Sequence, residues 1–509
     1  MLPLVGYGWC PIECLVTPGQ RVNIGDSLGK GLPATVSGTV QTIESRPMAH
    51  PGESEAPCVI LEPDAAASKT IQARHLKAFP EQPELTIERL AAAGVRGLGG
   101  GGFPAADKLT GRIHTLVINA VECEPCISCD NALLIDEADA VLAGVADLVH
   151  LSGANRCILA IEDNMPLALE HLQAAIDTGT AAIEIEIEIE IALVPAIYPA
   201  GAERPLLQAL LGLNLADRER PVAHGVMLSN VATAHAAGRA RRGYPMVDRV
   251  VTITGPAARR PGNYRIRFGT PIAKALEASG NDGANLALRI GGPLNGYPIS
   301  NPHTPITATC NCLILTEPER ETAAAGTAHE APCIRCSACS DHCPEALFPQ
   351  ELMRFADAGD GQGAADIGLD RCIECGVCDL VCPSSIRLTA RFRHARSELR
   401  LERERREEAR LAEARMQARN TRLAEREAAR LARREAAWRA RHEAAGTEGD
   451  KADGHARVAA GQPARNSDVP LNGSAGNARA VEDQGLNREP GLRRQRRRRR
   501  KPNPRRRNP

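Results

Sequence analysis

The chain has 509 residues, with 62 basic and 62 acidic side chains, and 43% of its residues are hydrophobic. This length predicts several domains, and the hydrophobic content excludes a wholly disordered chain. The charge is unevenly spread, because residues 493–507 are mostly basic and include no acidic residue; the rest of the chain is net acidic, which excludes the overall charge typical of a nucleic-acid-binding protein.

No run of eighteen or more apolar residues occurs, and residues 1–14 lack a basic region followed by an apolar stretch. We therefore expect neither a membrane-spanning helix nor a signal peptide. The chain contains 17 cysteines. In a long chain without a signal peptide, this number favours a reducing compartment, and thiolate chemistry or metal binding over a disulfide framework.

The first 75 residues are rich in Gly, Pro, Val and Thr. They predict a small β-module, with a strand pattern over residues 35–43 and turns at Pro18-Gly19 and Gly25-Asp26. The turn at residues 36–40 resembles the hairpin of a lipoyl or biotin carrier. A carrier needs a lysine at the tip of that turn and none is present, so we interpret the module as structural.

Helical and strand patterns alternate over residues 84–245, which predicts an α/β domain with a helix at 85–93 and strands at 115–121 and 183–191. Residues 248–316 return to β character with glycine turns. A polar linker at 322–330 precedes a cysteine-rich segment, 333–383, in which residues 347–355 are expected to be helical. Residues 389–445 predict a solvated charged helix with too few large apolar residues for a stable coiled coil, and residues 446–509 predict disorder.

The strongest pattern in the sequence is a doubled motif, C-x2-C-x2-C-x3-C-P, which starts at Cys333 and again at Cys372. This run binds a [4Fe–4S] cluster, and the fourth cysteine of each run ligates the other cluster. Two adjacent clusters indicate electron transfer. Zinc is the disfavoured alternative, because four-cysteine zinc sites usually separate two C-x2-C pairs by a longer loop. We define ligand set I as Cys333, Cys336, Cys339 and Cys382, and ligand set II as Cys372, Cys375, Cys378 and Cys343.

A third grouping, Cys123, Cys126 and Cys129, has the same initial spacing, but Asp130 and Asn131 follow in place of a fourth cysteine. We interpret these residues as three free thiols on a loop after a strand. The alternative is a third cluster completed by a distant ligand.

A glycine-rich loop, residues 97–104 (Gly-Leu-Gly-Gly-Gly-Gly-Phe-Pro), formally satisfies G-x-G-x-x-G. A dinucleotide fingerprint follows a strand and opens a helix, whereas this loop follows a predicted helix, so an ordinary Rossmann assignment is weak. The glycines still permit positive φ and close approach of backbone N–H groups to a phosphate or a flat ring. The alternative is a flexible loop without a function.

The glycine loop with Lys108, followed by residues 119–125 (Asn-Ala-Val-Glu-Cys-Glu-Pro), resembles the flavin-binding core of the NADH-oxidising subunit of respiratory complex I. Over roughly residues 15–388 the chain more closely resembles the C subunit of the Rnf-type (Rsx-type) ion-translocating oxidoreductase complex. The resemblance implies a multidomain α/β and α+β fold. Its parts would be a barrel-sandwich β-module (1–75), a Rossmann-like FMN- and NADH-binding α/β domain (84–245), a β-grasp domain (248–316), a helical two-cluster ferredoxin domain (325–388), a charged helix (389–445) and a disordered basic tail (446–509).

The resemblance also implies the cofactor contacts. The glycines would surround the FMN phosphate and ring, Lys108 and Asn119 would hold polar groups of the flavin, and the acidic residues would contact flavin or nucleotide. Two further segments, residues 198–203 and 230–233, lie where the family has such contacts. The implied cofactor-binding residues are Gly97, Gly99, Gly100, Gly102, Lys108, Asn119, Glu122, Glu124, Tyr198, Glu203, Asn230 and Thr233.

This sequence departs from the family at several positions. Cys126 stands where the family usually has Tyr, Ala202 where it usually has Gly, and Gly101 where Ala is common; these changes bear on flavin affinity. The basic end of the chain favours contact with anionic lipid over nucleic acid, because no aromatic residue is interleaved there. A solvated tail without a partner is the alternative.

The sequence therefore predicts a peripheral subunit on the cytoplasmic side of the cell inner membrane. It would pass electrons between NADH and membrane partners through FMN and two [4Fe–4S] clusters, because nicotinamide delivers two electrons and a cluster accepts one. The partners would be the integral membrane and the iron–sulfur or flavoprotein subunits of one complex. The first alternative is a flavin-free electron-relay or binding module with a degenerate nucleotide site. The second, a soluble complex I-type dehydrogenase subunit, is disfavoured by the two cluster motifs.

Overall fold

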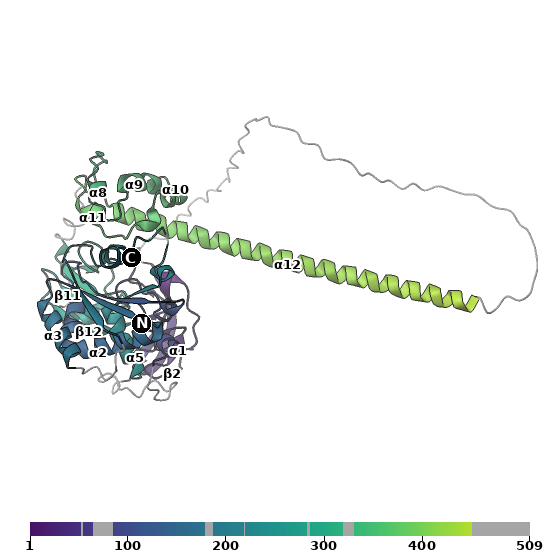
Figure 1. The fold of residues 1–509 in the computed structure, drawn as a ribbon, viewed down its shortest axis with the longest axis horizontal. Helices are drawn as coiled ribbons and strands as arrows, with labels where there is room; N and C mark the ends of the chain where they lie inside the picture. Colours follow the sequence, from purple (N-terminus) through teal and green to yellow (C-terminus); the bar gives the residue numbers. More distant parts are fainter. Residues whose placement is uncertain are drawn as a thin grey trace, which may run out of the picture. The chain divides into compact units, whose positions relative to one another are not determined.

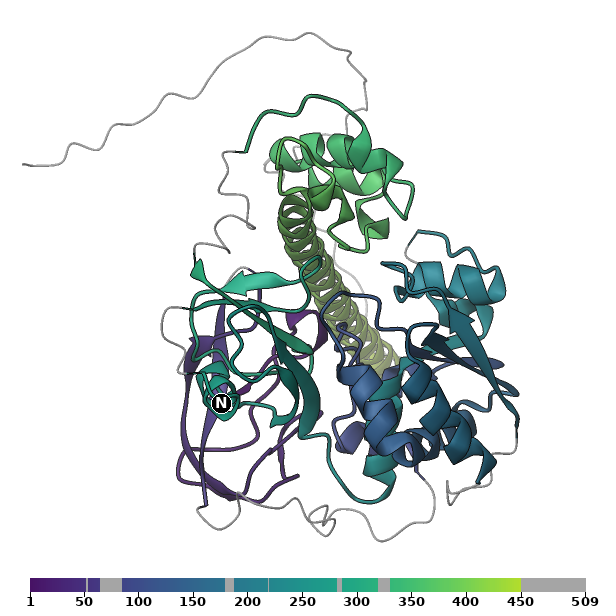
Figure 2. The ribbon, with the colours of Figure 1, turned by 90° about the vertical axis from the view of Figure 1, so that its left-hand side faces the viewer.

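The computed structural model describes residues 1–51, 54–64, 85–178, 187–217, 219–281, 286–318 and 330–449. The chain divides into two compact units, Met1–Ala414 and Arg415–Pro509. The described residues of the first unit form three main sheets and a helical segment (Figures 1 and 2). This mixed composition confirms the predicted α/β class. Within the described ranges, we find no helix with the length and apolarity needed to cross a bilayer.

The N-terminal residues form an antiparallel sheet with the strand order β1-β6-β5-β2, and a two-stranded ribbon, β3-β4. Leu28, Val40 and Val59 are fully buried here and share one core with the following α/β region. Residues 65–75 of the predicted module lie outside the described residues. The strands are β1 (Leu2–Pro3), β2 (Arg21–Val22), β3 (Ser27–Gly29), β4 (Leu32–Pro33), β5 (Gly38–Pro47) and β6 (Glu55–Pro63), and η1 (Tyr7–Trp9) is a short 3-10 turn.

The second sheet is parallel throughout, in the order β10-β7-β8-β9. The middle residues of its central strands, 116–118 and 157–161, are continuous apolar runs, as expected for strands that are covered on both faces. The strand predicted at 183–191 begins later, at Ile189, and residues 183–186 lie outside the described residues. The strands are β7 (Thr115–Ala120), β8 (Arg156–Glu162), β9 (Ile189–Val194) and β10 (Val226–Asn230).

Helices cover both faces of this parallel sheet. Helices α2, α3 and α5 share a core with Leu116, Ile118 and Leu159 on one face, while α4 packs against Val117 and Ala160 on the other. Helices α2 and α5 approach closely at Gly144, where a Cβ would lie 1.7 Å from the carbonyl oxygen of Ala234. The elements are α1 (Ile87–Ala92), η3 (Ala106–Leu109), α2 (Cys129–Ser152), α3 (Pro166–Asp177), α4 (Glu203–Leu211), η4 (Pro221–His224) and α5 (Val231–Arg241).

The third sheet is mixed, in the order β12-β11-β15-β13-β14. Strands β11 and β15 are parallel and the other pairs are antiparallel. Helix α6 packs on this sheet through Ile272 and Leu276, which are fully buried. The elements are β11 (Asp248–Thr254), β12 (Gly262–Arg267), α6 (Ile272–Ala278), β13 (Ala287–Ile290), β14 (Tyr297–Ile299) and β15 (Cys312–Thr316).

The cysteine-rich segment is built from short helices around a small core that contains Leu352, Leu369 and Phe392. The helix predicted at 347–355 is α9, and it begins at Pro349 because proline is favoured in the first turn. The helices labelled in Figure 1 are α8 (Ala338–Asp341), α9 (Pro349–Asp357), α10 (Gly361–Asp366) and α11 (Val377–Leu380). The 3-10 turn η5 (Leu369–Arg371) lies between α10 and α11 in the sequence.

The predicted charged helix is α12 (Leu388–Gly449). Its large apolar side chains beyond residue 400 are exposed, including Met416 and Trp438, as expected for a helix that is not a coiled coil. The helix continues past the predicted end at residue 445. A glycine such as Gly446 costs a solvated helix only about 1 kcal/mol, and an established helix extends cooperatively through a single unfavourable residue. Residues 450–509, with the basic end, lie outside the described residues.

Candidate functional site

The predicted cofactor residues gather at one edge of the parallel sheet. The chain adds β8 and β9 on one side of β7 and then returns to place β10 on the other side. The carboxyl ends of β7 and β10 therefore form a topological switch point, where ligands bind in open α/β sheets. Asn119 is near the end of β7, Asn230 ends β10, and Asn230 Nδ2 donates to the Asn119 carbonyl oxygen at 3.4 Å.

The glycine loop joins this edge through the start of α5. The backbone N–H of Leu98 donates to Thr233 Oγ1 at 2.9 Å, and a Cβ on Gly99 would lie 3.2 Å from Asn230 Cβ. The loop follows helix α1, as predicted, and not a strand. The loop closes on itself, because Gly97 donates to the Phe103 carbonyl oxygen at 2.8 Å.

The outer part of the glycine loop lies on the wall of a cavity of about 1360 Å³ within the first unit. Gly100 and Gly102 have φ of 100° and 66°, and a Cβ on Gly100 would meet no heavy atom within 4 Å. The loop therefore leaves space against its backbone N–H groups, as a phosphate requires. Among the twelve predicted cofactor residues, those lining this cavity are Gly99, Gly100 and Gly102.

Three polar residues lie on the other side of the switch point: Lys108, Asn119 and Glu203. Lys108 Nζ donates to the Leu228 carbonyl oxygen at 2.8 Å, and Asn119 Nδ2 donates to the Gly201 carbonyl oxygen at 2.9 Å. Burial lowers the pKa of Lys108, and the nearby carboxylate of Glu203, at the start of α4, opposes this shift. The cation and the carboxylate are therefore close enough to interact, and the cation is bonded to β10.

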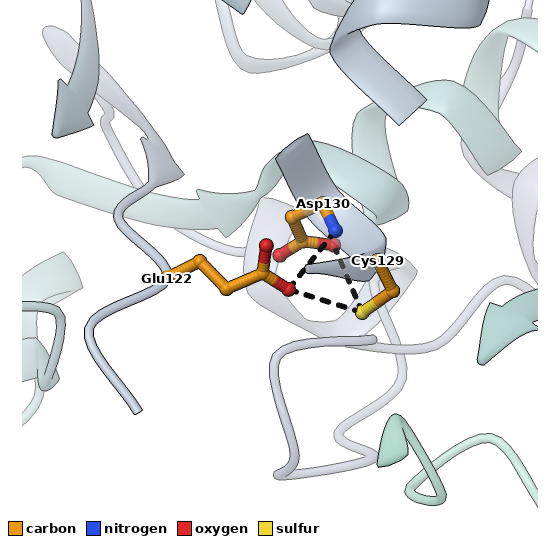
Figure 3. Close-up of side chains that lie close together, drawn as sticks. All are labelled: Glu122, Cys129 and Asp130. Carbon is orange, nitrogen blue, oxygen red and sulfur yellow. Dashed lines mark hydrogen bonds between the residues drawn. The ribbon is translucent and has the colours of Figure 1, made fainter. Parts of the chain in front are cut away.

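Glu122 closes the N-terminus of α2 (Figure 3). Its Oε1 accepts from the backbone N–H of Asp130 at 3.0 Å and from Cys129 Sγ at 3.2 Å, and its Oε2 accepts from the N–H of Asn131 at 3.1 Å. Burial and the neighbouring Asp130 raise the pKa of Glu122 to about 7. Both oxygens of this carboxyl group therefore accept hydrogen bonds from the start of α2, and the group is poorly placed to bind a cofactor.

The prediction that Cys123, Cys126 and Cys129 lie together on a loop is wrong for Cys129, which is the first residue of α2. Its thiol is buried because the helix begins there, and it lies within 4.8 Å of ligand atoms of Glu122 and Asp130. Burial and these carboxylates raise the pKa of Cys129 well above its usual value. The thiol donates its proton to Glu122, so in this arrangement it serves the start of the helix.

Replacing Glu122 by Gln is expected to weaken the pH dependence of folding. The folded-state pKa of about 7 lies above the ordinary value of 4.5, so the folded chain keeps a proton that the unfolded chain releases, and stability falls as the pH rises from about 4.5 to 7. Between pH 5 and 8, urea unfolding should show a loss of stability that is smaller in Glu122→Gln by roughly 2 kcal/mol. Equal losses in the two proteins would contradict the assignment.

Glu124 and Tyr198 do not point into open space. Glu124 is 7% exposed, and its Oε1 accepts from the backbone N–H groups of Leu294 and Asn295 at 2.7 and 3.0 Å. Tyr198 Oη donates to the carbonyl oxygen of Cys375 at 2.6 Å. These two residues therefore link the α/β region to the turn between β13 and β14 and to the cysteine-rich segment.

Ligand set I comes together in the structure. Cys333, Cys336 and Cys339 line one small pocket together with Cys382 from the second run. Gln350 Oε1 accepts from Cys339 Sγ at 3.3 Å and from Ser340 Oγ at 2.7 Å. Cys382 of the second run therefore lies beside the first run, as ligand set I requires, and its role as the fourth ligand stays a prediction.

Ligand set II shows the reciprocal arrangement. Burial raises the pKa of Cys375, and the proximity of Cys343 from the first run adds to the shift. Burial also raises the pKa of Cys372 to about 11, with a further contribution from Cys375. Thiols this close together are costly to ionise unless a metal binds the thiolates, so the donor set fits an iron–sulfur cluster.

The two cysteine runs repeat one backbone conformation. Equivalent residues have positive φ in both: Arg335 with Glu374, Ser337 with Gly376, and Ala346 with Ser385, all between 51° and 73°. Single left-handed residues turn successive N–H groups toward one side, which forms an anion-binding concavity. Since a [4Fe–4S] cluster with four thiolates is anionic, the loops also fit it through their backbone.

Sequence reasoning missed several polar residues of this region. Asp130, which is buried, accepts from Asn230 Nδ2 at 2.6 Å, and Arg249 Nη1 donates to the Leu98 carbonyl oxygen at 3.1 Å. Arg396 Nη2 donates to the carbonyl oxygens of Leu369 and Cys372, both at 2.6 Å. The acid directly after Cys129 was a local signal for Asp130, but the two arginines bond to residues far away in the sequence.

Comparisons with known proteins agree with this arrangement. A family described as the Nuo51 FMN-binding domain matches residues 90–239, and a family described as a 4Fe-4S dicluster domain matches residues 332–386.

Curated relatives are named as the C subunit of an ion-translocating oxidoreductase complex. The protein of Pasteurella multocida (strain Pm70) is 37% identical over 75% of this chain and 46% of its own length, and that of Erwinia tasmaniensis is 38% identical over 84% and 54%. This chain therefore spans about half the length of these relatives. A solved structure, NAD+-reducing [NiFe]-hydrogenase in the H2-reduced state, is 21% identical with a TM-score of 0.47, over 64% of this chain and 63% of that chain.

Proposed function

We propose a function from the premise that this chain is a homologue of the C subunit of ion-translocating oxidoreductase complexes and carries an FMN-binding domain and a 4Fe-4S dicluster domain. It is an electron-transferring oxidoreductase subunit that passes electrons between NADH and other subunits of a complex. FMN bound at the switch point would accept the hydride of NADH, and two [4Fe–4S] clusters, one in each ligand set, would carry single electrons.

The observation that carries this proposal is the meeting of two kinds of site in one compact unit. The switch point gathers the glycine loop, Lys108, Asn119 and Asn230, and the fourth cysteine of each run lies beside the other run. The glycine N–H groups would hold the FMN phosphate, Lys108 would supply a positive charge, and Asn119 and Glu203 would orient polar groups of the flavin. The cavity of about 1360 Å³ exceeds the size of most ligand pockets, so it has room for a nicotinamide nucleotide as well.

The finer domain assignments belong to the same proposal. Residues 1–75 would be the barrel-sandwich module, 84–245 the FMN and NADH domain, 248–316 the β-grasp domain and 325–388 the two-cluster ferredoxin domain. The five-stranded mixed sheet and the paired cysteine loops support the last two. The protein would sit at the cytoplasmic face of the cell inner membrane against membrane-embedded partners, and the basic end would contact anionic lipid.

Anaerobic purification with iron and flavin analysis tests the function. We expect about eight iron atoms per chain from two cubane clusters, one FMN, and bleaching of the flavin by NADH. Replacing Lys108 by Met should lower FMN affinity about tenfold or more, since a charge-assisted hydrogen bond contributes about 1.5–3 kcal/mol, and should leave the iron content unchanged. Iron without flavin in the wild-type protein would favour the flavin-free relay, and a colourless zinc protein would exclude both functions.

A further inference from the structure

The two ligand sets differ in exposure, although their loops repeat one conformation. Cys333 and Cys336 of set I are exposed, whereas the equivalent Cys372 and Cys375 of set II are half-buried. The third positions follow the same trend, because Cys339 is half-buried and Cys378 is buried. Identical spacing does not cause this difference, so it arises from what covers each loop.

Set II is covered by the α/β region. Tyr198, from the segment before α4, donates its hydroxyl hydrogen to the carbonyl oxygen of Cys375 at 2.6 Å. Tyr198 therefore joins a predicted flavin-site segment directly to a cluster-ligating residue.

The turn between β13 and β14 also packs against the cysteine loop of set II. A Cβ on Gly376 would lie 2.3 Å from the Leu294 carbonyl oxygen, so the backbones of the two segments touch. Glu124 holds this turn from the α/β side through Leu294 and Asn295. Arg393 holds it from the other side, since it donates to the Asn295 carbonyl oxygen at 2.7 Å and pairs with Glu374 at 2.9 Å.

We propose that ligand set II holds the inner cluster, which exchanges electrons with the flavin site, and that ligand set I holds the outer cluster, which exchanges electrons with a carrier outside the chain. Tyr198 is the positioning residue that fixes the inner loop against the flavin domain. This inference rests on the proposed function and adds the order of the two clusters to it. Its basis is the Tyr198–Cys375 contact together with the exposure of Cys333 and Cys336.

The electron balance follows from this order. One NADH is oxidised to NAD+ by loss of a hydride, which carries two electrons. Ligand set II would hold the group that takes these electrons one at a time from the flavin site, and ligand set I would hold the group that passes each of them out of the chain. A one-electron carrier of the iron–sulfur or flavoprotein class is the final oxidant and is reduced once per electron.

Two single-cluster variants test the order by rapid freeze-quench electron paramagnetic resonance. In Cys336→Ala, which lacks the outer cluster, NADH should still reduce the remaining cluster at the wild-type rate. In Cys378→Ala, which lacks the inner cluster, NADH should no longer reduce the remaining cluster on the same timescale, while dithionite still reduces it. The opposite pattern, with NADH reduction lost in Cys336→Ala and kept in Cys378→Ala, would overturn the proposal.

Tyr198→Phe provides a test that keeps all eight ligands. Loss of one hydrogen bond should slow NADH-driven reduction of the inner cluster about tenfold and shift its midpoint potential, with iron content and the outer cluster's potential unchanged. Ser340→Ala, which removes the Ser340–Gln350 hydrogen bond beside set I, is the matched control and should leave the inner cluster unaltered. Equal effects of both variants on both clusters would contradict a positioning role for Tyr198.

An experiment that does not use NADH distinguishes a failure of this inference from a failure of the proposed function. If NADH did not bleach the flavin, the proposed function would be refuted, but the proposed order of the inner and outer clusters would not. Dithionite-reduced wild-type protein should then lose the signal of the outer cluster first when ferricyanide, a small anionic oxidant, is added. Earlier oxidation of the inner cluster would refute the order whatever the electron donor is.

Discussion

The Cys382→Ala variant is expected to lose the cluster of the first cysteine run, although Cys382 belongs to the second. Cys382 lines one pocket with Cys333, Cys336 and Cys339, and a cubane normally requires four thiolates. Iron should fall from about eight to about four atoms per chain. Iron analysis and the paramagnetic spectrum of the reduced protein measure the loss.

Double variants decide which cysteines share a cluster. Cys382→Ala with Cys336→Ala should keep about four iron atoms, because both residues serve the same cluster, whereas Cys382→Ala with Cys375→Ala should keep almost none. If each cysteine run instead held its own cluster with its own four cysteines, the result would be reversed. Cys382→Ala with Cys336→Ala would then lose all iron, and Cys382→Ala with Cys375→Ala would retain half of it. Circular dichroism of each variant shows whether the rest of the chain remains folded.

The chemistry of the cysteines could be predicted from the sequence because it is local. A cubane needs thiolates at short fixed intervals, so the motif carries both the residue type and the spacing. The glycine loop was recognised for the same reason, since its glycines are consecutive. The strand order of the parallel sheet could not be predicted in this way. Leu116, Val117 and Ile118 identify one buried strand, but they do not show that β10 pairs with the opposite edge of β7 from β8.

The roles of Glu124 and Tyr198 could not be predicted in this way. Their hydrogen-bond partners, Leu294 and Cys375, lie 170 and 177 residues away in the sequence, so only the folded chain brings them together. The resemblance placed both residues beside a nucleotide, and that placement stays a prediction. Cys129 was misplaced for another reason: the pattern of cysteines suggested a loop, whereas the backbone N–H groups that Glu122 accepts from begin a helix there.

Replacing Gly376 by Ser is expected to destabilise the inner cluster selectively. Gly376 has φ of 73°, and its counterpart in the first run, Ser337, has φ of 65°. Because Ser337 carries a side chain, positive φ alone does not require glycine at this position of the loop. The requirement at Gly376 comes from the Leu294 carbonyl oxygen, which a Cβ would approach to 2.3 Å, so the substitution must move the loop or the turn.

The expected cost is roughly 2–4 kcal/mol, from the clash and the loss of glycine's freedom. Under a chelator, Gly376→Ser should release iron from set II faster than the wild-type protein does and from set I at the same rate. Ser337→Gly is the matched control, since it changes the equivalent residue in the opposite direction without removing a contact to Leu294. If Gly376→Ser retained both clusters as long as Ser337→Gly, the turn would not press on the inner loop, and its burial would need another cause.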